Sequence, residues 1–113
     1  MKLGKWGEET AASYLLKNGY RILDKNYTCR FGELDLIVQK EKQICFVEVK
    51  TRRSLQFGEP CESITKKKQK HIHKSIQVYL MNRKLNNYEL RIDVIELLLL
   101  DKKIYLRHIK NAF

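Results

Sequence analysis

The sequence predicts an α/β fold whose elements follow one another as helix, three strands, helix and two strands. Two segments carry apolar residues at helical spacing, and five others show the alternation and short apolar runs typical of strands. The 113 residues, 43% of them hydrophobic, suffice for one compact core, so we expect a single domain over residues 1–113. Without any repeat, low-complexity tract or linker, the natural architecture is a mixed central sheet flanked by two main helices.

The first half of the chain is expected to form one helix and three strands. Apolar residues share a stripe around Ala11 and Leu15, and the Asn18-Gly19 pair predicts the end of a helix over residues 4–18. The three strands, which are separated by short polar or glycine-containing turns, are predicted at residues 20–29, 33–38 and 44–50.

The second half is expected to form a loop, a helix and a hairpin. Residues 51–61 contain the only proline and are predicted to be a loop. A helix is predicted from Glu62 to about Met81, followed by a turn at residues 82–87. The last two strands, which are joined by a charged turn, are predicted at residues 90–99 and 104–109.

The chain is strongly basic, and its positive charge is concentrated in one region. Its 23 Lys and Arg against 13 Asp and Glu give a formal net charge of +10, and eight of these charges lie after Glu62. Basic residues crowd residues 50–74, whereas acidic residues gather earlier, at positions such as Glu8, Asp35 and Glu48. This balance favours a polyanionic partner, nucleic acid before a membrane surface.

No segment predicts a membrane span or a secretion signal. The longest apolar run, Leu97 to Leu100, is far shorter than the roughly 20 residues that cross a bilayer, and charges interrupt the apolar positions near the N-terminus. Cys29, Cys45 and Cys61 are odd in number, with no Cys-x-x-Cys pair and no histidine at a zinc-ligand offset. We therefore expect a cytoplasmic protein without a disulfide framework or a zinc site.

The hairpin of the second and third strands carries the most informative charges. With a turn at residues 40–43, the numbers of paired residues sum to 83, which sets Asp35 opposite Glu48. The same register sets Glu33 opposite Lys50. Opposed residues have Cβ atoms about 4.5–5.5 Å apart, so the two carboxylates would converge and repel. A divalent cation bound by oxygen ligands, or the Lys50 ammonium, would offset their charge.

Strand alternation predicts which side chains share a face with these carboxylates. The predicted charged face holds Glu33, Asp35, Ile37, Ile44, Phe46, Glu48 and Lys50, and the opposite face of the second strand holds Leu34, Leu36 and Val38. A solvated ladder of charges is the alternative interpretation. The apolar members of the charged face argue against it, because partly covered carboxylates seldom lack a partner or a function.

Each helix is expected to direct one charged residue toward the sheet. Glu8 lies on the apolar stripe of the first helix, although the helix dipole alone could also account for an acid in the first turn. Lys68 lies on the apolar stripe of the second helix, where a lysine whose ammonium reaches water is the alternative. The outward residues of that helix, which form either a solvated face or a track for phosphates, are Lys66, Lys70, His73 and Lys74.

Two blocks of the hairpin resemble the D…ExK signature of PD-(D/E)xK nucleases, which have the restriction-endonuclease-like fold: Gly32-Glu33-Leu34-Asp35-Leu36-Ile37 and Phe46-Val47-Glu48-Val49-Lys50-Thr51-Arg52. From end to end, the chain is similar to the small bacterial YraN-like family, related to archaeal Holliday junction resolvases. The further blocks that carry this similarity are Gly4-x-x-Gly7-Glu8-x-x-Ala11-x-x-Tyr14-Leu15, Gly19-Tyr20-x-Ile22-Leu23, Arg91-Ile92-Asp93-Val94-Ile95 and Asn111-Ala112-Phe113. The chain departs from the wider superfamily at Leu34, where a proline often stands, and at His73, where RecB-type members have a tyrosine.

The resemblance implies a role for each charged residue of the hairpin. Asp35 and Glu48 would bind Mg²⁺ or Mn²⁺, with the carbonyl of Val49 completing the site, and Glu8 would assist through the metal or a bound water. Lys50 would orient or deprotonate the attacking water. The residues expected to contact nucleic acid are Arg52, Arg53, Lys66, Lys68, Lys70 and Lys74.

These features lead to the hypothesis of a metal-dependent endonuclease that hydrolyses phosphodiester bonds in DNA, with branched or damaged structures as substrates and RNA as an open alternative. A non-catalytic nucleic-acid-binding module for repair or recombination is the second hypothesis. A third is an interaction protein that uses the strand of Leu97 to Leu100 as an edge. Because junction-cutting relatives work as dimers, a homodimer through this edge or through Trp6 is a further hypothesis.

The three histidines are assigned no catalytic role. His71 and His73 cannot share a helix face, and His108 is predicted to lie in the last strand, far from any acid. Asp93 remains either an alternative acid or a structural acceptor of hydrogen bonds.

Overall fold

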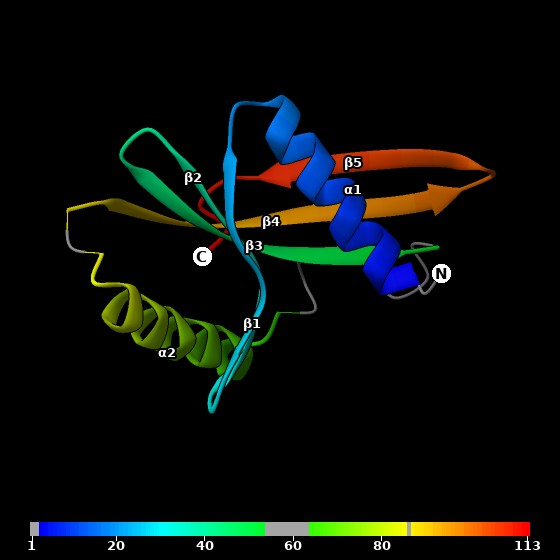
Figure 1. Ribbon diagram of the computed structural model, residues 1–113. Helices are drawn as coiled ribbons and strands as arrows, with labels where there is room; N and C mark the ends of the chain where they lie inside the picture. Colours follow the sequence, from blue (N-terminus) through cyan, green and yellow to red (C-terminus); the bar gives the residue numbers. More distant parts are fainter. Residues whose placement is uncertain (1–2, 54–63, 86) are drawn as a thin grey trace.

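The computed structural model describes residues 3–53, 64–85 and 87–113 and confirms the predicted α/β order (Figure 1). Its elements are α1 (Leu3–Lys17), β1 (Arg21–Cys29), β2 (Gly32–Lys40), β3 (Gln43–Arg52), α2 (Lys66–Arg83), β4 (Glu89–Leu100) and β5 (Lys103–Ile109). The strands form one mixed sheet in the order β1-β2-β3-β4-β5, in which β3 and β4 are parallel and the other neighbours antiparallel. The chain crosses from β3 to β4 through α2, as a parallel connection requires.

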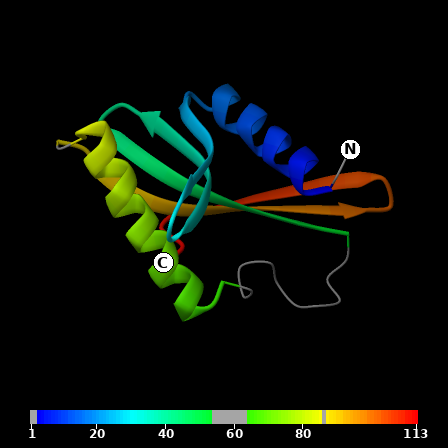
Figure 2. The same ribbon diagram turned by 60° about the horizontal axis from the view of Figure 1, so that its bottom comes forward.

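The two helices cover opposite faces of the sheet (Figure 2). On one face, α1 buries Ala11 and Leu15 against Leu36, Val47 and other strand residues. On the other, α2 buries Ile72, Ile76 and Tyr79 of the predicted stripe against Ile37, Ile44 and Phe46. Ile64 joins this cluster but precedes the helix. Burial of these apolar surfaces is the main force that holds each helix on the sheet. Neither helix of the described residues is long and apolar enough to cross a membrane.

Two predicted boundaries in the second half of the chain are wrong. The predicted loop 51–61 begins too early, because Thr51 and Arg52 continue β3 and pair with Leu97 and Leu98 of β4. The second helix begins at Lys66 and not at Glu62. Its N-cap is Thr65, whose side chain accepts a hydrogen bond from the Lys68 backbone N–H at 3.1 Å. Residues 54–63, which hold the rest of that loop and the predicted helix start, lie outside the described residues.

The C-terminal end of α2 also lies beyond its predicted position. The helix continues through Asn82 and Arg83, which were assigned to the turn at residues 82–87. It ends at Lys84, whose backbone adopts the left-handed conformation with a φ of 54° and whose N–H bonds to carbonyls of the last turn. Residue 86 lies outside the described residues.

The predicted register of the central hairpin is confirmed from Lys40 and Gln43 to Leu36 and Val47. The predicted pairs of Asp35 with Glu48 and of Glu33 with Lys50 lie beyond this paired stretch. The predicted alternation of β2 fails at Leu34, which packs with α2 instead of sharing the α1 face with Leu36. The change of face falls around Asp35, within a strand that runs from Gly32 to Lys40. Neither Asp35 nor Asn26, which has a φ of 50°, belongs to the paired residues of β1 and β2.

The proposal that the strand of Leu97 to Leu100 forms an edge is wrong. This segment belongs to β4, which lies between β3 and β5 in the sheet. Leu97 is fully buried and pairs with Leu106 of β5. The outer strands of the described sheet are β1 and β5.

The close approach of α1 to β3 requires a glycine at position 7. A Cβ added to Gly7 would clash with Oγ1 of Thr51 and would lie 3.1 Å from the Thr51 Cβ. Gly7 immediately precedes Glu8, so the same contact sets how near Glu8 lies to the sheet.

We expect Gly7→Ala to lower the free energy of unfolding by about 1–3 kcal/mol, because the added methyl group overpacks this contact. Thr51→Ala removes the Oγ1 that the methyl group would strike but keeps the Cβ, so the double variant should recover part of the loss, as measured by urea denaturation of all four proteins. Additive effects of the two substitutions would contradict this account of the contact.

Candidate functional site

Three carboxylates meet on the side of the sheet that carries α1. Glu8 of α1 and Glu33 and Asp35 of β2 place oxygen atoms within 4.8 Å of one another. The Asn26 amide, with its nitrogen turned toward them, donates hydrogen bonds to Glu8 at 2.7 Å and to Glu33 at 2.8 Å. Burial raises the pKa of the Glu8 carboxyl above its usual value, and the charges of Asp35 and Glu33 raise it further.

Asp35 joins this group to β3. Its Oδ2 accepts a hydrogen bond from the backbone N–H of Val49 at 2.8 Å, just beyond the last paired residues of β2 and β3. Its carboxyl is also hydrogen-bonded to that of Glu48. One aspartate therefore links the carboxylates on the α1 side with a fourth carboxyl on the neighbouring strand.

Glu48 is the most strongly perturbed acid of the site. Only 4% of it is exposed, and burial raises the pKa of its carboxyl to about 9, with a further contribution from Asp35. The ammonium groups of Lys50 and Lys68 act in the opposite direction but do not cancel the effect. At neutral pH without a cation, Glu48 therefore holds a proton.

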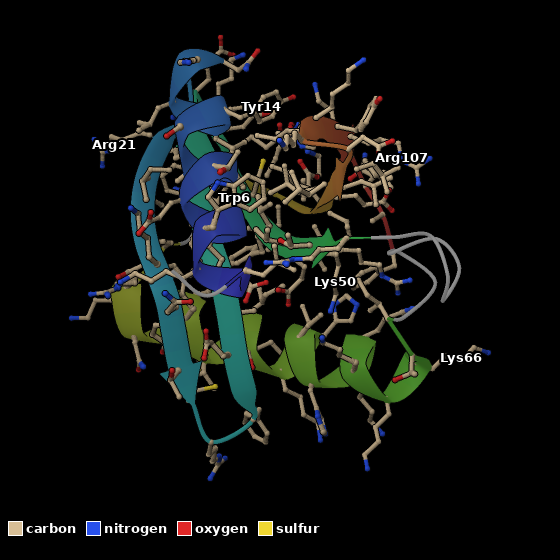
Figure 3. All side chains as sticks on the ribbon, turned by 90° about the vertical axis from the view of Figure 1, so that its right-hand side faces the viewer. Trp6, Tyr14, Arg21, Lys50, Lys66 and Arg107 are labelled. Carbon is tan, nitrogen blue, oxygen red and sulfur yellow. The ribbon has the colours of Figure 1, made fainter. Side chains whose placement is uncertain are left out.

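Lys50 lies two residues beyond Glu48 and points to the same face of β3. It is half-buried, and burial together with the nearby Lys68 lowers the pKa of its ammonium to about 8. Lys68 reaches this position from the first turns of α2, as its place on the apolar stripe predicted. Figure 3 shows Lys50 near the centre of this side of the molecule, with Trp6 of α1 above it and Lys66 of α2 below.

The donor set fits a hard divalent cation. Carboxylate oxygens are the ligands of Mg²⁺, Mn²⁺ and Ca²⁺, which bind oxygen at roughly 2.0–2.6 Å, and the separations among Glu8, Glu33 and Asp35 allow one ion to contact all three. Glu48 reaches this group only through Asp35. A metal bond from the Val49 carbonyl stays a prediction, since the contact that the structure describes for Val49 is made by its N–H.

Glu33 and Asn26 are the members of the site that sequence reasoning missed. Glu33 was placed on the charged face but given no role, although its position two residues before Asp35 was a sufficient signal. Asn26 gave no comparable signal, because its amide reaches the acids from β1 through an unusual backbone conformation.

Most of the residues predicted to contact nucleic acid are exposed. Lys66, Lys68, Lys70 and Lys74 are exposed along α2, and Arg53 is exposed just after β3. Arg52 is partly buried at the end of β3. Their role as phosphate contacts stays a prediction.

The prediction that His108 lies far from any acid is wrong. Its Nε2 lies 2.7 Å from Oδ2 of the fully buried Asp93. The Arg91 guanidinium donates to both oxygens of the same carboxylate, at 2.8 and 2.9 Å, and the Asn111 N–H donates to Oδ1. His108 pairs with Ile95 across the β4–β5 hairpin and is thus diagonal to Asp93. This network makes Asp93 a structural acceptor that joins β4, β5 and the C-terminal segment.

The fold and the acidic cluster define a small, basic α/β protein with a candidate cation site. A model of the uncharacterised protein family UPF0102 matches residues 7–97. A UPF0102 protein of Clostridioides difficile is 48% identical over 110 residues, which cover 97% of this chain and 95% of the relative. A UPF0102 protein of Syntrophomonas wolfei is 47% identical over 112 residues, covering 99% and 97%, and one of Caldanaerobacter subterraneus is 47% identical over 114 residues, covering 98% and 93%. The chain therefore belongs to the UPF0102 family, in agreement with its resemblance to YraN-like proteins.

The raised pKa of Glu48 predicts how stability depends on pH in metal-free buffer. The unfolded chain releases this proton near pH 4.5, whereas the folded protein holds it to about pH 9. The stabilisation is therefore complete below pH 4.5 and is lost as pH rises through this interval.

Glu48→Gln carries no charge at any pH, so we expect it to be more stable than the parent at pH 8, on the order of 2 kcal/mol, with the difference disappearing near pH 4.5. Thermal unfolding in EDTA across this interval measures the effect. The exposed Glu89→Gln is the control and should show no such pH dependence. A constant difference between Glu48→Gln and the parent at all pH values would show that Glu48 is not protonated in the folded protein.

Proposed function

We propose that this protein is a metal-dependent endonuclease that hydrolyses phosphodiester bonds in DNA. The observation that carries the proposal is the position of Asp35, which contacts the carboxylates of Glu8 and Glu33 on one side and that of Glu48 on the other. Lys50 lies beside this group with a lowered pKa. Neighbouring acids and a lysine with perturbed pKa values are typical of catalytic sites.

In this proposal, Mg²⁺ or Mn²⁺ is held by the carboxylates of Asp35, Glu8 and Glu33, with Glu48 as a further ligand once it loses its proton. A bound divalent ion supplies Lewis-acid stabilisation of the phosphate oxygens and lowers the pKa of a coordinated water. The ion also removes the repulsion that four neighbouring carboxylates would exert on a DNA phosphate.

Lys50 would move the proton of the reaction. With a pKa near 8 it exchanges a proton close to neutral pH, so its neutral amine can accept a proton from water while the water oxygen attacks phosphorus. The new P–O bond forms as one P–O ester bond breaks, and the leaving oxygen takes a proton from solvent. The neighbouring Lys68 keeps Lys50 partly deprotonated and stabilises the charge that develops on the phosphate.

The remaining support comes from charge and fold. A net charge of +10 favours binding to a polyanion, and the element order agrees with the restriction-endonuclease-like fold that the D…ExK resemblance implies. The same resemblance, to a family related to junction resolvases, makes branched or damaged DNA the substrate class to test first.

We expect Asp35→Asn to abolish cleavage of linear, single-stranded and four-way-junction DNA in the presence of Mg²⁺ or Mn²⁺, because it removes the carboxylate that joins the acids. Lys50→Met should reduce the cleavage rate by roughly 10²–10⁴-fold through loss of proton transfer. Asp101→Asn, in the exposed turn between β4 and β5, is the matched control and should cut at the parental rate. Equal cleavage by Asp35→Asn and the parent would refute the nuclease assignment.

The exposed lysines of α2 favour a second candidate function, a non-catalytic module that binds nucleic acid. In either case, the triple variant Lys66→Gln, Lys70→Gln, Lys74→Gln should bind DNA more weakly, and the slope of log affinity against log salt should fall by about 0.9 for each lost phosphate contact. Lys102→Gln, on the β4–β5 turn, should leave the slope unchanged. If the parent binds DNA with this salt dependence but never cuts it, the second function replaces the first.

A further inference from the structure

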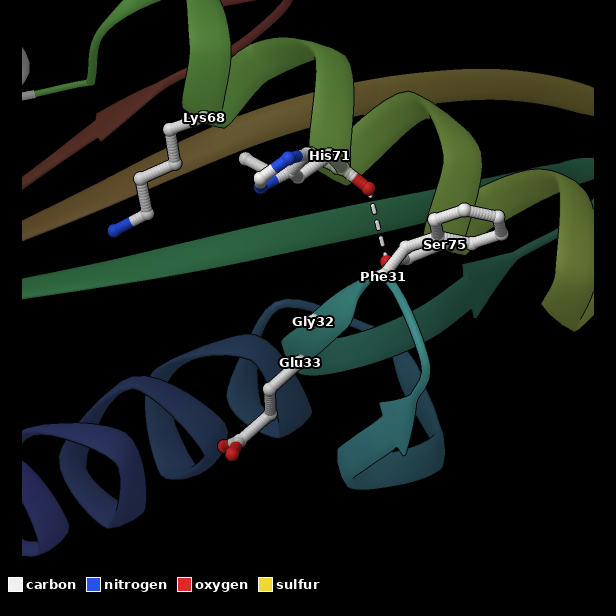
Figure 4. A pocket seen from close by; sticks show the side chains of 7 residues that line it. Phe31, Gly32, Glu33, Lys68, His71 and Ser75 are labelled. Atoms are coloured by element: carbon white, nitrogen blue, oxygen red, sulfur yellow. Dashed lines mark hydrogen bonds between the residues drawn. The ribbon is translucent and has the colours of Figure 1, made fainter.

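A small pocket opens between α2 and the turn that joins β1 to β2. Its walls are formed by Phe31, Gly32 and Glu33 on the strand side and by Lys68, His71, Ile72 and Ser75 on the helix side. Figure 4 shows Lys68 and His71 projecting from α2 on one side of the opening and Glu33 on the other, with Phe31 beside Ser75.

The pocket borders the acidic site directly, because two of its wall residues also belong to that site. Glu33 is one of the three carboxylates that could hold a cation, and Lys68 lies against Lys50 and Glu48. A phosphate placed over the acids would therefore put the adjacent sugar and base at the mouth of this pocket.

The chemistry of the walls suits a flat heteroaromatic ring. Phe31 and His71 provide two rings, and the 3% exposed Ile72 provides an apolar floor. At Gly32, a side chain would meet no atom within 4 Å, so the backbone there leaves space for a ligand. The Ser75 hydroxyl donates a hydrogen bond to the His71 carbonyl at 2.9 Å, and this bond helps to hold the helix side of the pocket in place.

The rim of the pocket is positive. The Arg30 guanidinium lies 4.8 Å from the centre of the Phe31 ring, and the Lys74 ammonium lies 5.4 Å from it. A base that stacks on Phe31 would take the place of one of these cations, and both side chains can bind the phosphates on either side of the inserted base. An aromatic platform between cations is the arrangement by which proteins bind single-stranded nucleic acid.

We propose that this pocket binds one unpaired nucleobase of the DNA strand whose phosphate lies over the acidic site. The proposal rests on the nuclease function proposed above and adds that the substrate has an unpaired nucleotide beside the cut. The pocket volume of about 130 Å³ is well below the roughly 300–1,000 Å³ of sites that enclose whole drug-sized ligands. One ring can enter it, whereas a stacked base pair cannot.

The test compares binding of single-stranded and duplex DNA by fluorescence anisotropy in the full-length Asp35→Asn protein, which should not cut either ligand. Adding Phe31→Ala should weaken binding of a fluorescein-labelled oligothymidylate by roughly 5- to 150-fold, the range expected for one lost stacking contact. Binding of a blunt duplex should not change, because no base leaves the stack. Phe31→Trp should retain the preference for the single strand.

An abasic substitution identifies the base itself. A series of oligothymidylates carries one abasic sugar in place of a thymine, at successive positions. At one position the abasic sugar should weaken binding as much as Phe31→Ala does. With that oligonucleotide, Phe31→Ala should cause no further loss of affinity. Tyr105→Ala removes an exposed aromatic residue from β5 and should change neither ligand's affinity. Equal losses on single strand and duplex, or affinity unaffected by every abasic position, would overturn the pocket assignment.

The two proposals fail in different ways. If the parent cuts DNA and Asp35→Asn does not, while Phe31→Ala leaves the preference for single strands intact, the nuclease function stands and the base pocket is wrong. If the parent cuts no DNA and binds neither ligand, both proposals are wrong. If Phe31→Ala unfolds at the same temperature as the parent protein, its weaker DNA binding does not come from a loss of folding.

Discussion

The geometry of the site depends on one hydrogen bond, from the backbone N–H of Val49 to the Asp35 carboxylate at 2.8 Å. It ties β2 to β3 beyond Leu36 and Val47, where their regular pairing ends. A charged acceptor bound to a backbone donor makes a strong and directional contact, so Asp35 is held by the sheet itself and not by another mobile side chain. Glu8 from α1 and Glu48 from β3 then approach a carboxylate whose position is already set.

The described part of the molecule contains two kinds of buried acid, which differ in their partners. One kind has a structural role, and the other is a candidate for function. Asp93 is fully buried, but Arg91, His108 and the Asn111 N–H all contact its carboxylate, so it has the partners that a buried acid needs and joins the last strand to β4. Glu48 is almost as buried, yet its nearest partner is another acid. Such an arrangement reduces stability unless a proton or a cation is bound, and it persists where a function requires it.

Much of the fold could be predicted because it follows from local patterns. The stripes of both helices, the order of the strands and the register of the central hairpin depend on residues close together in the chain, and all three agree with the structure. The predictions failed where distant segments decide the outcome. β3 extends through Thr51 and Arg52 because β4 offers partners for them, and Leu34 packs on the α2 face although Leu36 packs on the α1 face.

The sequence alone determined the class of fold, the family resemblance and the presence of Asp35, Glu48 and Lys50 on one hairpin, because hairpin register operates over short distances. Only the tertiary structure showed that Glu33 and Asn26 join Glu8, that Asp93 is hydrogen-bonded within a network of its own, and that a pocket opens beside the acids. These features require side chains from elements far apart in the chain. Whether these side chains come into contact depends on how α1 and α2 pack on the sheet. The spacing of residues along the chain does not predict that packing.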